Sequence, residues 1–260
     1  MSQPHGYVNS AYLQAMADLL KRNKQRSYEW MRVQRGQRVL DVGCGPGMDT
    51  LPLAHLVGPT GQVVGLDADP AMVAEANQRA RAAGVDGWVT HEEGDATLLS
   101  YASDSFDACR SERLFQHLHA APRALAEMVR VTKGGGWVVV LDTDWGSLSW
   151  DSPEVDIERR LARVRAEHYL ANGYAGRQLY RLAKEQQLND IQVDILPTVM
   201  TDYSVYRSGA LLDEVERHAV RMGAVTDDEL QRWHGSLEDA AARGTFFGTG
   251  SSVLVAGRKG

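Results

Sequence analysis

Cysteine is scarce in this chain of 260 residues, which contains only Cys44 and Cys109. The two lie far apart and lack the spacing of metal ligands, so the sequence predicts neither a disulfide framework nor a metal site. No stretch approaches the roughly 18 uninterrupted apolar residues that a membrane-spanning helix needs. Charged residues also interrupt residues 1–30, where a signal peptide would carry its apolar core. We therefore expect no membrane span and a reducing, cytoplasmic location.

An excess of basic residues is absent as well. The chain has 28 Lys and Arg against 34 Asp and Glu, which gives a formal net charge of -6. This charge repels a phosphate backbone and removes the main source of nucleic-acid affinity, so we expect a small-molecule substrate and no nucleic-acid partner. Hydrophobic residues make up 43% and charged residues 24%, as in ordinary globular domains, and one domain spanning 1–260 is the simplest reading.

Strand and helix patterns alternate through the first half of the chain. An amphipathic pattern over 12–30 predicts a helical N-terminal segment within 1–35. Short apolar runs then alternate with helical patterns, which predicts an α/β fold with a doubly wound, mostly parallel sheet. The expected strands are 38–42, 62–66, 87–92, 106–110 and 136–142, and the expected helices are 49–57, 70–83, 114–117 and 122–131.

The second half continues with more helix than the sheet requires. Helical patterns cover 176–187, 208–222 and 226–243, strands are expected at 191–200 and 250–257, and the charged segment 151–172 predicts an inserted helix. The insertions 151–172 and 208–243 have two readings. They form a lid over a substrate pocket, or they pack the sheet edge or support a homodimer. The sequence leaves the oligomeric state open.

A glycine-rich turn separates the first strand from its helix. Gly43, Gly45 and Gly47 let the backbone turn tightly and let a ligand approach amides near a helix N-terminus, although a turn that needs positive φ would use the same residues. The dinucleotide fingerprint requires a third small residue, and the two possible counts place Met48 or Thr50 there. The loop therefore favours a ligand without a pyrophosphate.

Acidic residues follow the next two strands. Asp67 ends the second strand, where a carboxylate can accept hydrogen bonds from both ribose hydroxyls, whereas a helix-capping role suits Asp69 better. After the third strand, Asp95 is placed to accept from an adenine amino group. Because the carboxyl ends of parallel strands share one edge of a sheet, the three signals together predict an adenosine-containing ligand.

These segments together resemble a known family. The sequences VLDVGCGPG at 39–47, VGLD at 64–67 and GDA at 94–96 resemble the class I S-adenosylmethionine-dependent methyltransferases, and the likeness covers about residues 36–145. The segments 104–108 and 131–136 are similar to the branch with ubiquinone/menaquinone biosynthesis and natural-product methyltransferases. The implied cofactor is S-adenosyl-L-methionine, and the implied activity is methyl transfer.

The resemblance also assigns positions in the site. It implies that the glycine-rich loop shapes the methionine pocket, that the second strand holds the ribose, that the third binds adenine, and that the fourth ends near the methionine portion. The residues at these four places are Gly43, Gly45 and Gly47; Asp67 and Ala68; Asp95 and Ala96; and Arg110 and Ser111. The family ends in an antiparallel hairpin, which 191–200 and 250–257 would form, so seven strands are expected.

Methyl transfer is an in-line displacement that depends mainly on alignment. If the acceptor is a hydroxyl, a general base that removes its proton would add to the rate. Candidate bases are Glu112, His117, His119, Asp142 and Asp144, of which His117 and Asp144 are preferred; the alternatives are a packing histidine and a turn aspartate. Aromatic residues suit an apolar or aromatic acceptor or else form core. They are Tyr7, Tyr12, Trp145, Trp150, Tyr169 and Tyr174.

Three rival functions stay open at this stage. An NAD-dependent oxidoreductase would share the sheet and the ribose acid but needs the missing third small residue. An RNA or protein methyltransferase would be expected to carry a basic, aromatic surface, which the acidic composition disfavours. A non-catalytic cofactor-binding module would share every motif, because a fold does not determine an activity.

Overall fold

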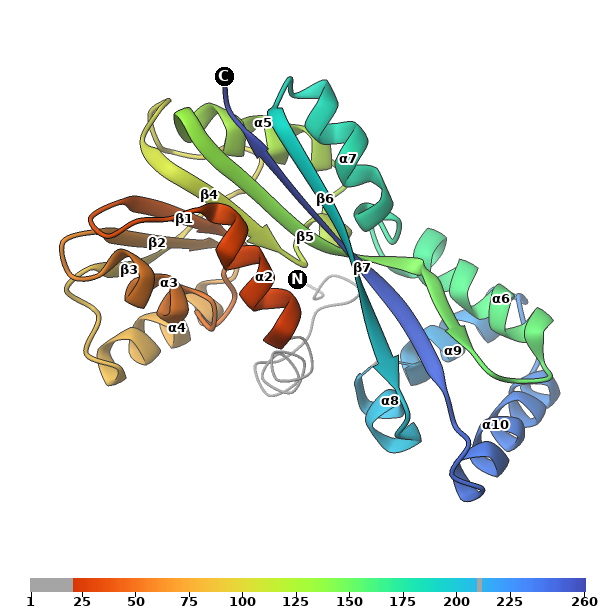
Figure 1. Cartoon of the computed structure of the whole chain (residues 1–260). Helices are drawn as coiled ribbons and strands as arrows, with labels where there is room; N and C mark the ends of the chain where they lie inside the picture. Colours follow the sequence, from red (N-terminus) through yellow and green to blue (C-terminus); the bar gives the residue numbers. More distant parts are fainter. Residues whose placement is uncertain (1–20, 210–211) are drawn as a thin grey trace.

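The computed structural model describes residues 21–209 and 212–260, and its centre is one seven-stranded sheet (Figure 1). The strand order is β3-β2-β1-β4-β5-β7-β6. The first five strands of the chain run parallel, and β7 pairs antiparallel with both β5 and β6. The strands are β1 (Arg38–Val42), β2 (Gln62–Asp67), β3 (Val89–Glu93), β4 (Phe106–Glu112), β5 (Thr132–Trp150), β6 (Asn189–Met200) and β7 (Gly248–Arg258). The predicted fold class is confirmed.

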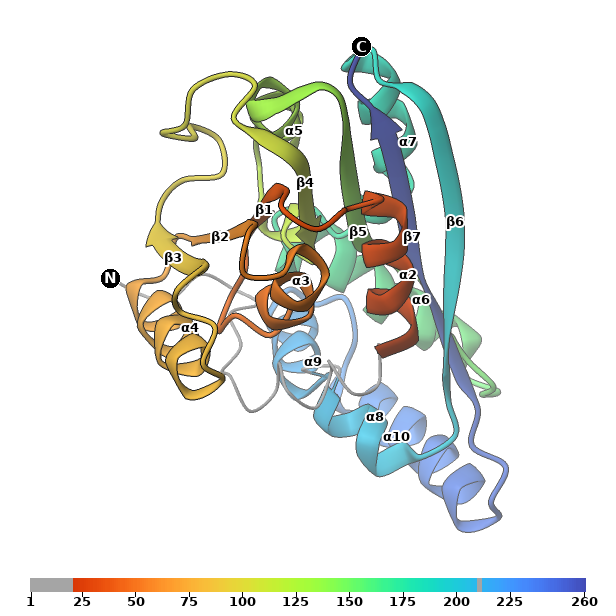
Figure 2. The same ribbon diagram turned by 60° about the vertical axis from the view of Figure 1, so that its left-hand side comes forward.

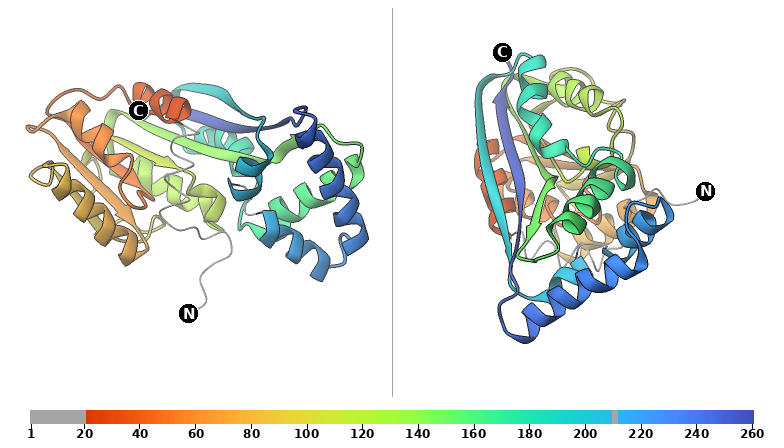
Figure 3. Two further views of the ribbon diagram at one scale, coloured as in Figure 1. Left: turned by 90° about the horizontal axis from the view of Figure 1, so that it is seen from below. Right: turned by 90° about the vertical axis from the view of Figure 1, so that its right-hand side faces the viewer.

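Helices cover both faces of the sheet. One face packs against α2 (Lys21–Met31), α3 (Thr50–Val57) and α4 (Pro70–Ala82), and the other packs against α5 (Ala121–Val131) and α7 (Ala175–Glu185). The edge-on view in Figure 3 shows the sheet between these layers. Because the central strands are covered on both sides, β1 is buried continuously after Arg38 rather than at alternate residues.

A helical lobe extends from the far end of the sheet (Figures 1 and 2). It contains α6 (Val155–Val164), the π-helical turn η2 (Arg165–Tyr169), α8 (Tyr203–Gly209), α9 (Leu212–Arg221) and α10 (Asp227–Ala242). The lobe has its own apolar core, which includes Trp150, Tyr206, Trp233 and Phe246. Leu148 and Trp150 of the long strand β5 and Met200 of β6 contribute to this core, so the lobe and the sheet share strands.

The structure differs from the predicted elements in three places. Strand β5 continues to Trp150, because β7 remains paired with it beyond an irregularity between Asp144 and Ser149. The segment 151–172 is not one helix but α6 followed by η2. Helix α8 was not predicted, and most of the helix expected over 12–30 lies outside the described residues. No helix among the described residues is long and apolar enough to cross a membrane.

Candidate functional site

The glycine-rich loop leaves β1 at the carboxyl edge of the sheet. Gly43 and Gly47 have φ of 74° and 76°, values that residues with a side chain rarely adopt. A Cβ on Gly43 would lie 3.0 Å from Cβ of Leu114, and one on Gly47 would lie 2.9 Å from Cβ of Ala76. These two glycines are therefore required by both backbone conformation and close packing.

Asp67, at the end of β2, bonds to the glycine-rich loop through its carboxylate. Its Oδ2 accepts a hydrogen bond from the Gly45 amide at 2.8 Å, and its Oδ1 accepts from the Asp69 amide at 3.0 Å. Asp69 itself caps α4 by accepting from the Ala71 amide at 2.8 Å, as the sequence predicted for it. Ala68 is exposed beside Asp67. The Asp67 carboxylate retains lone pairs toward solvent, since it is only half-buried.

Asp95 lies beside Asp67 on the next strand end. The Gly94 amide donates to the Asp67 carbonyl at 3.0 Å, which brings the two segments together. Oδ1 of Asp95 accepts from the amide and the hydroxyl of Thr97 at 2.7 and 2.8 Å, and this fixes an otherwise exposed side chain. Ala96 is buried in the core behind it. The structure thus places the predicted ribose and adenine residues at one edge.

Arg110 lies at the centre of a buried ionic cluster. Only 1% of the residue is exposed, and its guanidinium pairs with Asp41 at 3.0 Å, Glu112 at 2.7 Å and Asp49 at 3.3 Å. Burial raises the pKa of Asp41 to about 7 despite the neighbouring Arg110. Burial would also raise the pKa of Asp49, but Arg110 and Lys24 together hold it well below its usual range. The cluster lies between the ends of β1 and β4 and the helix α2, and it bonds these elements together.

Helix α2 is attached to this cluster through Lys24. Its Nζ donates to Asp49 at 2.8 Å and to Glu112 at 2.7 Å, while the hydroxyl of Tyr28 donates to Asp49. Sequence reasoning did not identify Lys24, Asp41 or Asp49 as part of the site. A charged residue inside the apolar run of β1 was the available signal, because a buried charge requires partners.

Buried polar atoms near the ends of β1 and β4 have no hydrogen-bond partner within the described part of the chain. They are Oδ2 of Asp41 and Oγ of Ser111, on the adjacent strands β1 and β4, and Nε of Arg110, which lies in the ionic cluster. Leaving such atoms unpaired costs about 1–3 kcal/mol each, so a polar ligand group there would be stabilising. Together with the tight glycine loop, these atoms fit an amino-acid moiety bearing ammonium and carboxylate groups.

The ends of β4 and β5 meet beside this edge. Asp144 is buried within β5, where its Oδ2 accepts from Nε of Arg177 at 2.8 Å and its Oδ1 has no partner among the described residues. His117 lies in the short helix η1 (Phe115–His117), and its side chain is exposed. Asp144 is therefore not a turn residue but a strand residue with one ion-paired oxygen.

Gln116 connects these two segments and was missed by sequence reasoning. Its backbone amide donates to Oδ2 of Asp142 at 3.2 Å, and its side-chain Oε1 accepts from Nε1 of Trp145 at 2.5 Å. Burial raises the pKa of Asp142 to about 7. This carboxyl group therefore fixes η1 against β5 instead of facing solvent.

The aromatic residues proposed for an acceptor have mixed positions. Trp150 and Tyr169 are core residues of the helical lobe, whereas Tyr174 donates to Glu167 at the surface of that region. Tyr7 and Tyr12 lie outside the described residues. Trp145 alone is bonded to the η1 segment at the carboxyl edge.

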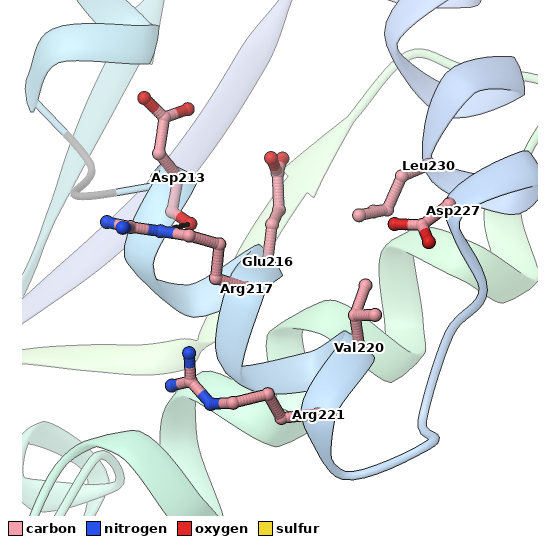
Figure 4. A pocket seen from close by; sticks show the side chains of 7 residues that line it. All are labelled: Asp213, Glu216, Arg217, Val220, Arg221, Asp227 and Leu230. Atoms are coloured by element: carbon pink, nitrogen blue, oxygen red, sulfur yellow. Dashed lines mark hydrogen bonds between the residues drawn. The ribbon is translucent and has the colours of Figure 1, made fainter.

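The helical lobe has a surface cavity of about 440 Å³ between α9 and α10 (Figure 4). Arg217 and Arg221 extend to one side of it, away from Leu230 and Asp227. The cavity contains no residue predicted from sequence. Among the described residues, no group of three or more His, Cys, Asp or Glu side chains could hold a metal ion. The lining residues are Asp213, Glu216, Arg217, Val220, Arg221, Asp227 and Leu230.

Comparison with known proteins gives a consistent result. Residues 39–136 match a family model described as a methyltransferase domain. An uncharacterized 37.1 kDa protein in a Streptomyces fradiae transposon is 33% identical over 94% of this chain and 70% of its own length. The 2-phytyl-1,4-naphtoquinone methyltransferase of Synechococcus elongatus is 34% identical over 46% of this chain, which spans 51% of that relative. The chain thus spans about half the length of its quinone-methylating relatives.

The fold also matches solved structures. The YcgJ protein of Bacillus subtilis aligns with a TM-score of 0.64 and 21% identity, over 93% of this chain and 98% of that protein. At this identity the match establishes the fold alone. The seven-stranded sheet and its flanking helices are therefore shared well beyond the segment that carries the sequence motifs.

Proposed function

Because the chain belongs to the class I S-adenosylmethionine-dependent methyltransferases, we propose that it transfers a methyl group from S-adenosylmethionine to a small-molecule acceptor in the cytoplasm. One observation carries the proposal. A loop with two obligatory glycines lies beside two acidic strand ends and buried polar atoms of Asp41 and Ser111 that find no partner among the described residues, all at one edge of the sheet.

The residues at that edge suit the three parts of the cofactor. Gly43, Gly45 and Gly47 would contact the methionine portion, together with Ser111. Asp67 beside Ala68 would accept from the ribose hydroxyls, and Asp95 with Ala96 would bind adenine. Arg110 would act from beneath, since its guanidinium is already paired with three carboxylates. It would orient Asp41 and Glu112 at the methionine end rather than contact the ligand itself.

When bound, S-adenosylmethionine supplies an electrophilic methyl group on a sulfonium centre. The contribution of the protein is then mainly alignment, which in well-oriented systems reaches roughly 7–11 kcal/mol. The ionic cluster suits this task, because Lys24 and Arg110 connect α2, β1, β4 and the start of α3 through buried charged bonds. Such bonds hold the loop and the strand ends in fixed relative positions.

We assign proton removal from the acceptor to Asp144, with His117 as the second candidate. Oδ1 of Asp144 has no hydrogen-bond partner among the described residues, while Arg177 fixes the other oxygen. No carboxylate orients His117 among the residues that the structure describes, and its Nε2 lies 3.0 Å from Nε2 of Gln116. A buried, oriented carboxylate is the better-placed base.

An apolar or aromatic acceptor is supported by two observations. The net charge of -6 opposes nucleic acid, and a relative that shares the motif region is named for a naphthoquinone substrate. Trp145, fixed by Gln116 at the carboxyl edge, offers an aromatic surface to such a molecule. The helical insertions would form the lid over it.

Methyl transfer from a radiolabelled donor tests this proposal. Reduced naphthoquinones and simple phenols serve as acceptors, with bulk RNA and denatured protein as the competing classes. We expect label in the small molecules only. Label in RNA or protein would overturn the assignment of the substrate class.

Asp144→Asn provides the corresponding test of the base. We expect kcat to fall by about 10²–10⁴ while the affinity for S-adenosylmethionine stays unchanged, because a general base contributes about that factor. Asp156→Asn, which removes a surface carboxylate paired with Arg160 on α6, is the matched control and should keep full activity. An Asp144→Asn variant with normal kcat would exclude Asp144 as the base.

A further inference from the structure

A buried histidine lies beneath the glycine-rich loop, and none of the roles above involves it. His91, on β3, is 6% exposed. Its Cδ2 lies 2.6 Å from the position of a Cβ on Gly65, and its Nε2 lies 3.0 Å from that of a Cβ on Gly47. The imidazole ring therefore occupies the space that two absent side chains leave between β2 and the loop.

Thr50 joins this histidine to the loop. It begins α3, is fully buried, and its hydroxyl donates to the Gly47 carbonyl at 2.9 Å. The same Oγ1 lies 2.9 Å from Nε2 of His91. Thr50 stands at one of the two positions where a dinucleotide fingerprint would need a third small residue. Here a hydroxyl group occupies that position and bonds to the loop.

Asn77 of α4 fixes the orientation of the ring. Its Nδ2 donates to the His91 carbonyl, and its Oδ1 accepts from the His91 amide, both at 3.1 Å. Because Oδ1 can only accept, the ring nitrogen Nδ1, also 3.1 Å away, must carry the proton. Burial lowers the pKa of His91 to about 4, so the neutral ring presents the Nε2 lone pair to Thr50. The single hydroxyl hydrogen of Thr50 is then shared between the Gly47 carbonyl and Nε2 of His91, which links the loop to the ring.

We propose that His91 and Thr50 are positioning residues that hold Gly47, and with it the glycine-rich loop, in the conformation that binds S-adenosylmethionine. This inference rests on the proposed function of the loop. Because both side chains are buried, we expect neither of them to contact the cofactor. A loop that leaves this conformation part of the time binds more weakly, because only the competent fraction takes up the ligand.

The test compares substitutions within α3. Thr50→Val removes the hydroxyl and keeps the branched shape, Thr50→Ser keeps the hydroxyl, and Val57→Ala destabilises the same helix at its far end, where Val57 is fully buried. Calorimetric titration with S-adenosylmethionine and amide hydrogen exchange of residues 43–48 are measured for each. We expect Thr50→Val to bind S-adenosylmethionine about three- to tenfold more weakly, which is the effect of losing one hydrogen bond. We also expect its loop amides to exchange faster. Thr50→Ser and Val57→Ala should keep wild-type affinity.

Two outcomes would overturn the inference. One is wild-type affinity and loop exchange in Thr50→Val. The other is an equal loss in Val57→Ala, which would show that helix stability and not loop position sets the affinity. A wild-type protein that does not bind S-adenosylmethionine would reject the proposed function instead. Hydrogen exchange would then still decide whether Thr50 holds the loop.

Discussion

Asp142 is a carboxylic acid inside the protein, and its environment gives stability a pH dependence. Burial raises its pKa to about 7, although it accepts backbone hydrogen bonds from Thr143 and Gln116. An ordinary aspartate in the unfolded chain ionises near pH 4. Between these two values the folded state binds more protons than the unfolded state, so the contribution of Asp142 to stability is present at low pH and is lost as the pH rises toward 7.

Asp142→Asn tests this, because the amide cannot ionise. We expect the unfolding free energy of the variant, relative to the wild type, to increase by on the order of 2 kcal/mol between about pH 5 and pH 8. Urea denaturation at both pH values measures the difference. Asp156→Asn, at an exposed position on α6, should show no such change. A difference that does not vary with pH would contradict the buried-acid account.

At the level of residues, the sequence predicted roles that depend on local structure, but not which distant residues would bond to each other. The glycine loop, Asp67 and the capping role of Asp69 follow from local rules about positive φ and strand ends. The network around Arg110 does not, because it joins residues of three separate segments, 24–28, 41–49 and 110–112. The position of Gln116 between Asp142 and Trp145 depends in the same way on tertiary contacts.

At the level of elements, Gly65 of β2 leaves space for the side chain of His91 on the neighbouring strand β3. A Cβ on Gly65 would lie 2.6 Å from Cδ2 of His91 and 2.8 Å from Sγ of Cys44. Gly65→Ala should therefore destabilise the chain by about 1–3 kcal/mol through overpacking. Removing the ring in the double variant Gly65→Ala/His91→Ala should recover part of this loss, as measured by denaturant unfolding. Strictly additive effects would show that the two positions do not pack against each other.

The elements best predicted from sequence were those with strong local signals. Strands β1 and β2 and helices α3 and α4 begin within one or two residues of expectation, because glycine, proline and aspartate mark their ends. The extension of β5 to Trp150 had no such signal, since it depends on pairing with β7 about 100 residues later. Helix α8 is short and packs in the lobe, and its periodicity alone did not reveal it.

At the level of the whole molecule, the sheet carries the cofactor edge and the helical lobe extends from its last strands (Figure 1). Strands β5, β6 and β7 connect the two regions, so a movement of the lobe would be transmitted to Asp144 and Trp145 in β5. The sequence predicted the number of strands and the presence of the insertions. The separate apolar core of the lobe depends on contacts between segments on either side of β6, which sequence periodicity does not show.

Calorimetric titration with S-adenosylmethionine and, separately, with NAD and NADH tests the central claim most directly. It compares the wild type with Asp67→Ala and with Asp69→Ala, a neighbouring carboxylate that caps α4. We expect the wild type to bind S-adenosylmethionine alone, Asp67→Ala to bind it at least about tenfold more weakly through loss of the charged ribose contact, and Asp69→Ala to bind it normally. Binding of NAD in place of S-adenosylmethionine would contradict the account and make the same edge a dehydrogenase site.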